Sequence, residues 1–556
     1  MKKYLFPFAL LALSQSIFSQ QVPPGFGGQA QQLPPALIPE KAVPRVDVNS
    51  GVAPSAVAVP DGVKIVVNTL RVTGAQAYSE AELLAVTGFM PGSELSLTDL
   101  RGMAARIADH YHRNGFFVAQ AYLPAQDIKD GVVTIAVMDG RLGKVSINNQ
   151  TKVSDALASQ LLGDLHSGDS VVSSALETPL LLLSDLPGVV VKSTLVPGAA
   201  PGTSDLNVDL TPGRSVSGSV DADNAGNRYT GENRIGATIN LNEPLGLGDV
   251  ASLRVLTSGP GLNYARASYQ LQVGKGKVGA AYSYLHYVLG REFESLQANG
   301  TAQTASLFGS YPLVRTRNSN LYAGLTMEAK AFKDKVDSVN SVTDKRAQVL
   351  TASLHGDQRD NLGGGGLNSY SLALSGGNID LQTPAVQAND ALTANSNGHF
   401  NKLAFSAGRL QRVTDALSVS ATINGQVATK NLDVSEKMAL GGMYAVRAYP
   451  EGEAYADEGY VLNLEARMQV PKFSDSMPGQ LQLIGFVDVG SVTVNKTPWA
   501  PGSNTRTLSG AGIGINWSET NNFMVRAYYA VKLGNETATS APDASGRFWI
   551  QAVKYF

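Results

Sequence analysis

Residues 460–469 read Tyr-Val-Leu-Asn-Leu-Glu-Ala-Arg-Met-Gln. From Leu462 onward, apolar side chains alternate with polar or charged ones, which is the period of a β-strand between two different environments. Similar alternation recurs at 235–241 and 417–424, and helical periodicity disappears from residue 213 onward. The polar side chains would all point to the same face of each predicted strand. A face of small polar and charged groups suits a water-filled lumen better than the dry core of a sandwich.

The number and length of these segments favour a membrane barrel. Residues 213–556 contain about sixteen of them, an even number, as in bacterial outer-membrane barrels. Each strand with its connection has about 21 residues, enough for a membrane-crossing strand of roughly 9–11 residues and a loop. The last segment, 546–556, ends on Phe556, and Lys554 on its apolar face is expected to reach toward the membrane interface. We predict an all-β transmembrane barrel of about 16 antiparallel strands; a soluble β-sandwich is the alternative.

A smaller α/β unit with the order β-α-α-β-β is predicted at 63–140. The helix expected at 97–113 has its apolar residues on one stripe, and Ser79 with Glu82 forms a capping box that opens a shorter helix. Strands are expected at 63–72, 116–123 and 132–138.

The same order recurs at 141–212, so two tandem copies of one small fold are predicted. The run of four leucines at 180–183 is assigned to the core of the second copy. Its expected elements are a strand at 145–147, helices at 154–162 and 176–183, and strands at 189–195 and 205–210.

The N-terminal segment predicts export. Residues 1–20 have a basic start, a short apolar centre and small residues afterwards, as in a secretory signal peptide. Residues 21–62 are rich in Pro, Gln, Gly and Ala, which is typical of an extended linker.

Composition excludes several functions. The chain has 44 Lys and Arg against 46 Asp and Glu, so no basic excess favours nucleic acid. It has no Cys, which excludes disulfides, thiolate metal sites and cysteine nucleophiles. A nucleophile elbow, a zinc-protease motif and a phosphate-binding loop are all missing, and the six His are scattered. We therefore expect no enzyme activity, no cofactor and no metal site.

The long connection at 431–459 contains the most informative motif. Its centre reads Val446-Arg447-Ala448-Tyr449, an Arg among apolar neighbours, which suits packing inside a cavity. Loops longer than about 12–15 residues are usually functional or disordered. An ordinary exposed loop is the alternative.

A partner acid is available in the segment Phe486-Val487-Asp488-Val489-Gly490. Asp488 has the same strand parity as Phe486 and Gly490. If that face points inward, Asp488 lies in the lumen, where a confined charge needs pairing. A merely solvated Asp488 is the alternative.

These motifs together resemble the two-partner secretion transporters, the TpsB family of haemolysin-activator and haemagglutinin-exporter type. Residues 446–449 are similar to the family's V-R-G-Y/F loop motif, with Ala448 in place of the usual Gly, and residues 486–490 are similar to its F-x-D-x-G strand motif. The units at 63–140 and 141–212 resemble POTRA domains. Further similarity lies at 185–189, 223–224, 229–231 and 242–249.

The resemblance implies a transporter in the outer membrane of a Gram-negative bacterium, with POTRA domains in the periplasm. It implies recognition of a large unfolded partner protein by the POTRA domains and secretion through the barrel of residues 213–556. Loop 431–459 would fold inward, where Arg447 pairs with Asp488 as a lumen anchor. The other expected partners are outer-membrane lipid and the barrel-assembly machinery that inserts the chain, and no nucleic acid.

Several alternatives stay open. A factor that assembles or inserts other barrel proteins is the first, and a passive diffusion porin, which has no use for residues 63–211, is the second. The passenger could be an adhesin, a cytolysin, a contact-dependent toxin or a haem-scavenging protein. Family members often carry a helix that plugs the pore, and here only residues 27–33 could make a short helical turn.

Overall fold

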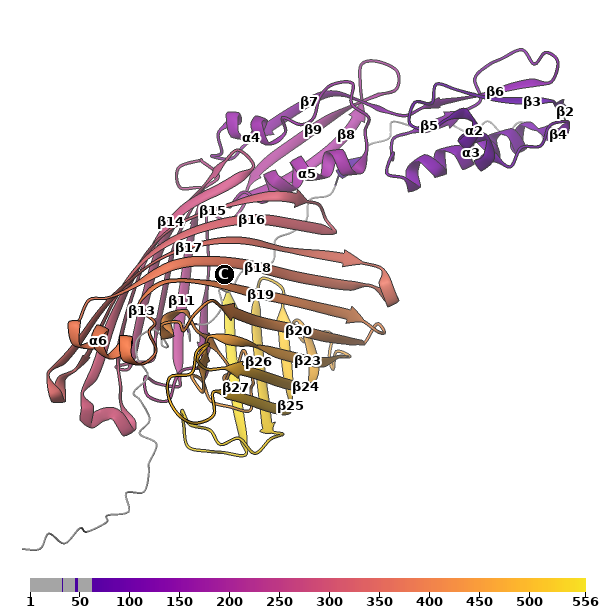
Figure 1. Cartoon of the computed structure of the whole chain (residues 1–556). Coiled ribbons are helices and arrows are strands. Elements are labelled where there is room, and N and C mark those ends of the chain that lie inside the picture. The colour runs from indigo at the N-terminus through magenta and orange to yellow at the C-terminus, as the bar shows by residue number, and fades with distance from the viewer. Residues whose placement is uncertain (1–32, 34–45, 49–62) are drawn as a thin grey trace, which may run out of the picture.

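The computed structural model describes residue 33, residues 46–48 and residues 63–556, so the predicted signal peptide lies outside the described residues. Sixteen strands between residues 216 and 555 close into one barrel of antiparallel neighbours (Figure 1). They are β10 (Val216–Asp223), β11 (Arg234–Asn242), β12 (Val250–Thr257), β13 (Leu262–Val273), β14 (Gly276–Val288), β15 (Ala298–Arg315), β16 (Ser319–Val336), β17 (Ser341–Asp360), β18 (Gly366–Leu381), β19 (Gly398–Arg412), β20 (Leu417–Ala428), β23 (Glu458–Val470), β24 (Gln480–Thr493), β25 (Thr505–Glu519), β26 (Phe523–Lys532) and β27 (Gly546–Tyr555). The predicted fold class is confirmed.

The two faces of the barrel wall carry different side chains. On β16, Leu325 and Met327 are exposed on the outer face. Thr326, Glu328 and Lys330, which alternate with them, line a cavity of about 570 Å³ inside the barrel. Successive side chains of a strand point to opposite faces, so the alternation in the sequence produces an apolar exterior and a polar bore.

The first α/β unit follows the predicted order with two corrections: its first strand is divided, and an unpredicted strand lies between its two helices. Its elements are β2 (Lys64–Val67), β3 (Thr69–Thr73), α2 (Glu80–Thr87), β4 (Ser93–Ser96), α3 (Leu97–Arg113), β5 (Gln120–Tyr122) and β6 (Val132–Met138). Ser79 and Glu82 form the capping box of α2, and the Ser79 hydroxyl is the main cause that lowers the pKa of Glu82. The prediction of one strand at 63–72 is wrong. Asn68 turns away to donate its backbone N–H to the Gly131 carbonyl (2.8 Å), so β2 pairs with β4 while β3 pairs with β6.

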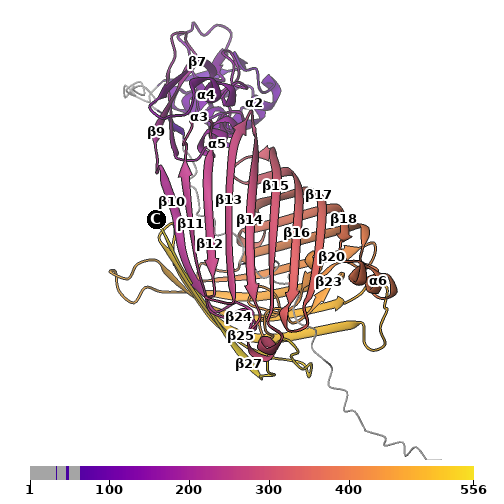
Figure 2. The ribbon, with the colours of Figure 1, turned by 90° about the vertical axis from the view of Figure 1, so that its left-hand side faces the viewer.

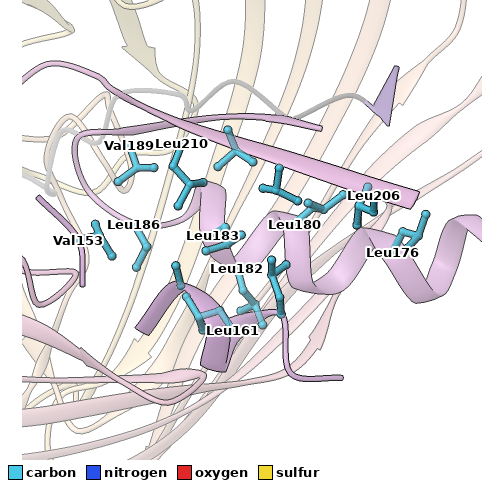
Figure 3. Packing of buried hydrophobic residues seen from close by; sticks show 14 of the residues in the cluster. Val153, Leu161, Leu176, Leu180, Leu182, Leu183, Leu186, Val189, Leu206 and Leu210 are labelled. Carbon is cyan, nitrogen blue, oxygen red and sulfur yellow. The ribbon is translucent and has the colours of Figure 1, made fainter. Parts of the chain in front are cut away.

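The second α/β unit has a leucine-rich core. Its elements are β7 (Arg141–Asn149), α4 (Asp155–Leu161), α5 (Ser173–Ser184), β8 (Val189–Pro197) and β9 (Thr203–Pro212). The four leucines at 180–183 are buried, and α5 packs Leu176, Leu180 and Leu183 with the sheet residues Leu206 and Leu210 in one cluster (Figure 3). These leucines are therefore core residues, as predicted.

A strand from the predicted linker extends the sheet of the second unit. The backbone of β1 (Val46–Val48) pairs in parallel with β8, with Val46 opposite Ser193 and Val48 opposite Leu195. The sheet order is therefore β1-β8-β9-β7, and β1 covers the edge that β8 would otherwise present.

The second unit docks on one end of the barrel (Figure 2), and the first unit lies beyond it (Figure 1). Arg315, at the end of β15, makes two hydrogen bonds of 2.8 Å to the Asp185 carboxylate, just after α5. The Ser154 N–H donates to the Gly246 carbonyl in the β11–β12 turn (3.1 Å). These contacts fix the second unit at the mouth of the barrel.

The opposite end of the barrel carries an unexpected helix, α6 (Pro384–Leu392), in the connection between β18 and β19 (Figure 1). Pro384 begins this helix, where the fixed φ of proline is suited to the first turn. Nine residues are too few to give a clear helical period in the sequence. Within residues 63–556, no helix is long and apolar enough to cross a membrane.

Candidate functional site

The loop predicted at 431–459 packs inside the barrel. Its two limbs pair briefly as β21 (Met438–Ala439) and β22 (Tyr455–Ala456). At its tip, Val446, Ala448 and Tyr449 are fully buried. The tip also contacts Trp549 of β27, whose neighbours Phe548 and Ile550 are exposed on the outer face. The loop therefore reaches the inward-facing side chains of the wall.

Arg447 at the tip is paired with Asp488 of β24. The guanidinium donates from Nε to Oδ2 (2.8 Å) and from Nη2 to Oδ1 (2.7 Å), a bidentate geometry. The backbone N–H of Arg447 also donates to Oδ2 (3.1 Å). Asp488 is fully buried and Arg447 is 4% exposed, so each charge depends on the other for compensation.

Two residues of β23 complete the polar site. Glu465 accepts a hydrogen bond from Nη1 of Arg447 (2.8 Å). Asn463, directly opposite Asp488 in the ladder, donates to Asp488 Oδ1 (2.7 Å) and to the Ala445 carbonyl (2.9 Å). The strand pairing thus places one further acid and one amide beside the Arg447–Asp488 pair.

Aromatic side chains surround the guanidinium. Its central carbon lies 3.5 Å from the ring centre of Phe486 and 4.9 Å from that of Tyr528, both within cation–π range. The Trp549 indole N–H donates to the Arg447 carbonyl (2.7 Å). Phe486 of the strand motif therefore packs directly against the Arg of the loop motif.

Small residues on the wall provide space for the tip. A Cβ built on Gly490 would collide with Leu440 and lie 3.2 Å from Val446 Cγ2. A Cβ built on Gly510 of β25 would collide with the Ala448 methyl group. Ala448 itself is not among the positive-φ residues of the described chain, so this position does not require glycine.

Tyr449, the last residue of the loop motif, also contacts the barrel at the tip. It is fully buried, its hydroxyl donates to the Glu536 carbonyl (3.1 Å), and the Lys532 ammonium lies 4.8 Å from its ring centre. The structure thus places Val446, Arg447, Ala448 and Tyr449 against one wall, together with Phe486, Asp488 and Gly490. Sequence reasoning missed Asn463, Glu465, Tyr528 and Trp549. Glu465 belongs to the alternating segment at 460–469, but its register against β24 could not be read from one strand alone.

One described residue that precedes the α/β units also borders the bore beside the loop. Leu33 lines the 570 Å³ cavity together with Ser435 of the loop. The rest of the segment considered for a plug, residues 27–32, lies outside the described residues. In the described part of the chain, no group of three or more His, Asp or Glu side chains could hold a metal ion. The site holds a loop in a polar bore by charge pairing.

Comparison with family models identifies two regions. The family described as haemolysin secretion/activation protein ShlB/FhaC/HecB matches residues 202–517. The ShlB-type POTRA domain matches residues 65–140.

Individual relatives are named as transporters. The heme/hemopexin transporter protein HuxB of Haemophilus influenzae (strain 86-028NP) is 29% identical over 472 residues, covering 84% of this chain and 82% of the relative. The outer membrane transporter CdiB of Escherichia coli O6:K15:H31 (strain 536 / UPEC) is 25% identical over 477 residues, covering 84% of this chain and 78% of CdiB.

Solved structures share the fold. CdiB from Escherichia coli superimposes with a TM-score of 0.66 at 20% identity, covering 91% of this chain and 93% of that chain. BamA from Haemophilus ducreyi lacking POTRA domains 1-3 gives a TM-score of 0.54 at 15% identity, covering 88% of this chain and 100% of that chain. At these identities the structural likeness concerns the fold alone.

Proposed function

The chain belongs to the haemolysin secretion/activation family ShlB/FhaC/HecB and is an outer-membrane transporter of two-partner secretion, and we propose that it exports a dedicated passenger protein in unfolded form. Family members export large partner proteins. The free space beside the loop, a cavity of about 570 Å³, supports an unfolded passenger, because it is far too small for a folded domain. The periplasm has no ATP supply, so folding of the passenger outside the cell would drive the transfer.

Recognition is assigned to the two POTRA-type units, which we place in the periplasm. An extended chain can bind by adding a strand to an exposed sheet edge, and such pairing needs no fixed side-chain code. The β8 edge already accepts an extended segment of this chain, β1, which supports this mode of binding. The passenger would enter the barrel from the end at which the second unit docks.

The tip anchor, defined as Arg447 with Asp488 and Glu465, would keep the loop attached inside the bore. Breaking the pair leaves one charge buried without compensation, so the anchored state is strongly favoured. The outer face of the barrel would contact outer-membrane lipid, and the barrel-assembly machinery would insert the chain after export. We propose the domain limits 1–20, 21–62, 63–140, 141–212 and 213–556 for signal peptide, linker, two POTRA domains and barrel.

The observation that carries the proposal is the inward loop, paired by Arg447 to Asp488, in a barrel that follows two α/β units. The test compares culture supernatants and outer membranes of wild-type, deletion and complemented strains by mass spectrometry. Loss of one large secreted protein, restored by the intact gene, is expected. Loss of many outer-membrane barrel proteins would instead identify an assembly factor. Unchanged supernatants with altered solute uptake would identify a porin.

The passenger class can be tested next. The relative named as a heme/hemopexin transporter is 29% identical, against 25% for the Escherichia coli CdiB. We therefore propose a haem-acquisition passenger as the first candidate. The deletion strain should fail to grow with haem–haemopexin as its iron source and grow normally on free iron. Equal growth on both sources would leave the adhesin, cytolysin and contact-dependent toxin classes.

A further inference from the structure

The first limb of loop 431–459 carries two acids against lysines of the barrel wall. Asp433 accepts two hydrogen bonds from the Lys345 ammonium of β17, at 2.7 and 2.9 Å. The Lys345 side chain is buried and its ammonium lies 4.8 Å from the ring centre of Phe332 on β16. This pair is shielded from solvent, unlike an ordinary surface ion pair.

Glu436, one turn further along the loop, bridges two more strands. Its Oε1 lies 2.9 Å from Lys330 Nζ on β16, and its Oε2 lies 2.9 Å from Lys402 Nζ on β19. Its backbone carbonyl accepts from Lys402 (2.8 Å) and from the Gln426 side chain of β20 (3.1 Å). Glu436 is only 2% exposed, so its charge is compensated almost entirely by these lysines.

These contacts lie on a different part of the wall from the tip anchor. Four strands, β18, β19, β20 and β23, separate Lys345 on β17 from Asp488 on β24 in the barrel order. The first limb and the tip are therefore attached to separate parts of the wall, and the second limb has its own ion pair between Glu453 and Arg506 of β25 (2.7 Å). Lys330, Glu328 and Ser435 also line the central cavity, so the first limb borders the free space of the bore.

We propose that Asp433 and Glu436, paired with Lys330, Lys345 and Lys402, form a second anchor of the loop, the wall anchor, which keeps the bore closed. Without the wall anchor, the first limb would lose its ion pairs with β16, β17 and β19. Passage of an unfolded chain then requires the wall anchor to part while the Arg447–Asp488 pair stays intact. This gating role rests on the proposed transport function, but closure of the bore is measurable without any passenger.

The test uses the purified full-length chain in planar lipid bilayers without passenger. In Asp433→Asn/Glu436→Gln, the fraction of time spent in high-conductance states should rise on the order of tenfold, because Lys345 and Lys402 lose their acids and Lys330 keeps only Glu328 (3.1 Å). The charge swap Asp433→Lys/Lys345→Asp keeps an ion pair with its charges reversed. In this variant the fraction should lie close to the wild-type value. The matched control Glu294→Gln/Asp475→Asn removes the same charge at two exposed positions and should not change it.

A second measurement follows the limb itself. The chain has no Cys, so Ser435→Cys adds a single thiol to the first limb. A membrane-impermeant thiol reagent should label it on the order of tenfold faster when Asp433→Asn/Glu436→Gln is also present. Wild-type conductance and labelling in a heat-modifiable double variant would overturn the proposal. The single variants Asp433→Asn and Glu436→Gln could also fail to insert into the membrane, with no recovery in the charge-swap variant. That result would assign the lysine pairs to folding and would overturn the gating role as well.

Discussion

Arg447 is bonded through both its side chain and its backbone. Each guanidinium nitrogen has a carboxylate partner, Asp488 or Glu465, and the backbone N–H and carbonyl bond Asp488 and Trp549. The guanidinium also stacks on Phe486. A planar fork with delocalised charge satisfies all of these contacts at once, and a lysine could not.

Arg447→Ala should therefore detach the loop tip and cut export by at least tenfold, while the barrel still folds and inserts. Removing one partner of a buried ion pair costs about 3–5 kcal/mol, and Arg447→Lys should recover only part of this. Export is measured as passenger in the supernatant, and folding as heat-modifiable migration. Arg467→Ala is the matched control, because Arg467 binds only the second oxygen of Glu465 and is partly exposed. Full export by Arg447→Ala would contradict the tip anchor.

The contact between Ala448 and Gly510 predicts a reciprocal effect. Gly510→Ala should destabilise the docked loop by about 1–3 kcal/mol, because the new methyl group collides with the Ala448 side chain. Ala448→Gly in the same chain should relieve the collision and restore docking. The measurement is protease cleavage of the loop in the folded protein. Equal cleavage of the Gly510→Ala single variant and the double variant would exclude this contact as the cause.

At the scale of elements, the sequence predicts local features well and pairing poorly. The apolar stripe of α3 predicted its bounds, Leu97–Arg113, because helical periodicity is local. The break at Asn68 was missed, since it depends on a hydrogen bond to Gly131, far along the chain. The Arg447–Asp488 pair was predicted as a hypothesis from motif resemblance, whereas Glu465 and Trp549 depend on strand register and barrel closure.

The strand β1 leads to a prediction about recognition. Its parallel pairing with β8 occupies a sheet edge that an extended passenger segment could use. Asp47→Pro should weaken this pairing, since proline cannot donate to the ladder. Loss of one or two hydrogen bonds of about 0.5–1.5 kcal/mol each should tighten binding of a passenger fragment about tenfold. Binding is measured on the detergent-purified full chain, with Ser50→Pro as the control. Weaker binding by Asp47→Pro would show that β1 supports recognition of the passenger rather than competing with it.

At the scale of the whole molecule, a bidentate ion pair is one of the contacts that join the second α/β unit to the barrel. Arg315 holds Asp185 with two hydrogen bonds of 2.8 Å, and both side chains are largely buried. A nearby pair, Arg317–Glu177 at 2.9 Å, joins the same two bodies, but its arginine is 45% exposed. The shielded, bidentate pair should therefore determine how the second unit is oriented toward the bore.

Asp185→Ala should leave both bodies folded and reduce export several-fold, because the second unit would no longer direct an extended chain into the barrel mouth. The exposed pair provides the matched control: Arg317→Ala should have little effect, since exposed ion pairs contribute only about 0–1 kcal/mol. The swap Asp185→Arg/Arg315→Asp should recover part of the lost export. Orientation is measured by spin-label distances between cysteines introduced in α4 and in β16, which the cysteine-free chain permits. For Asp185→Ala, we expect a broadened distance distribution together with reduced export. An unchanged distribution with wild-type export would mean that the Ser154–Gly246 contact and its neighbours orient the second unit instead.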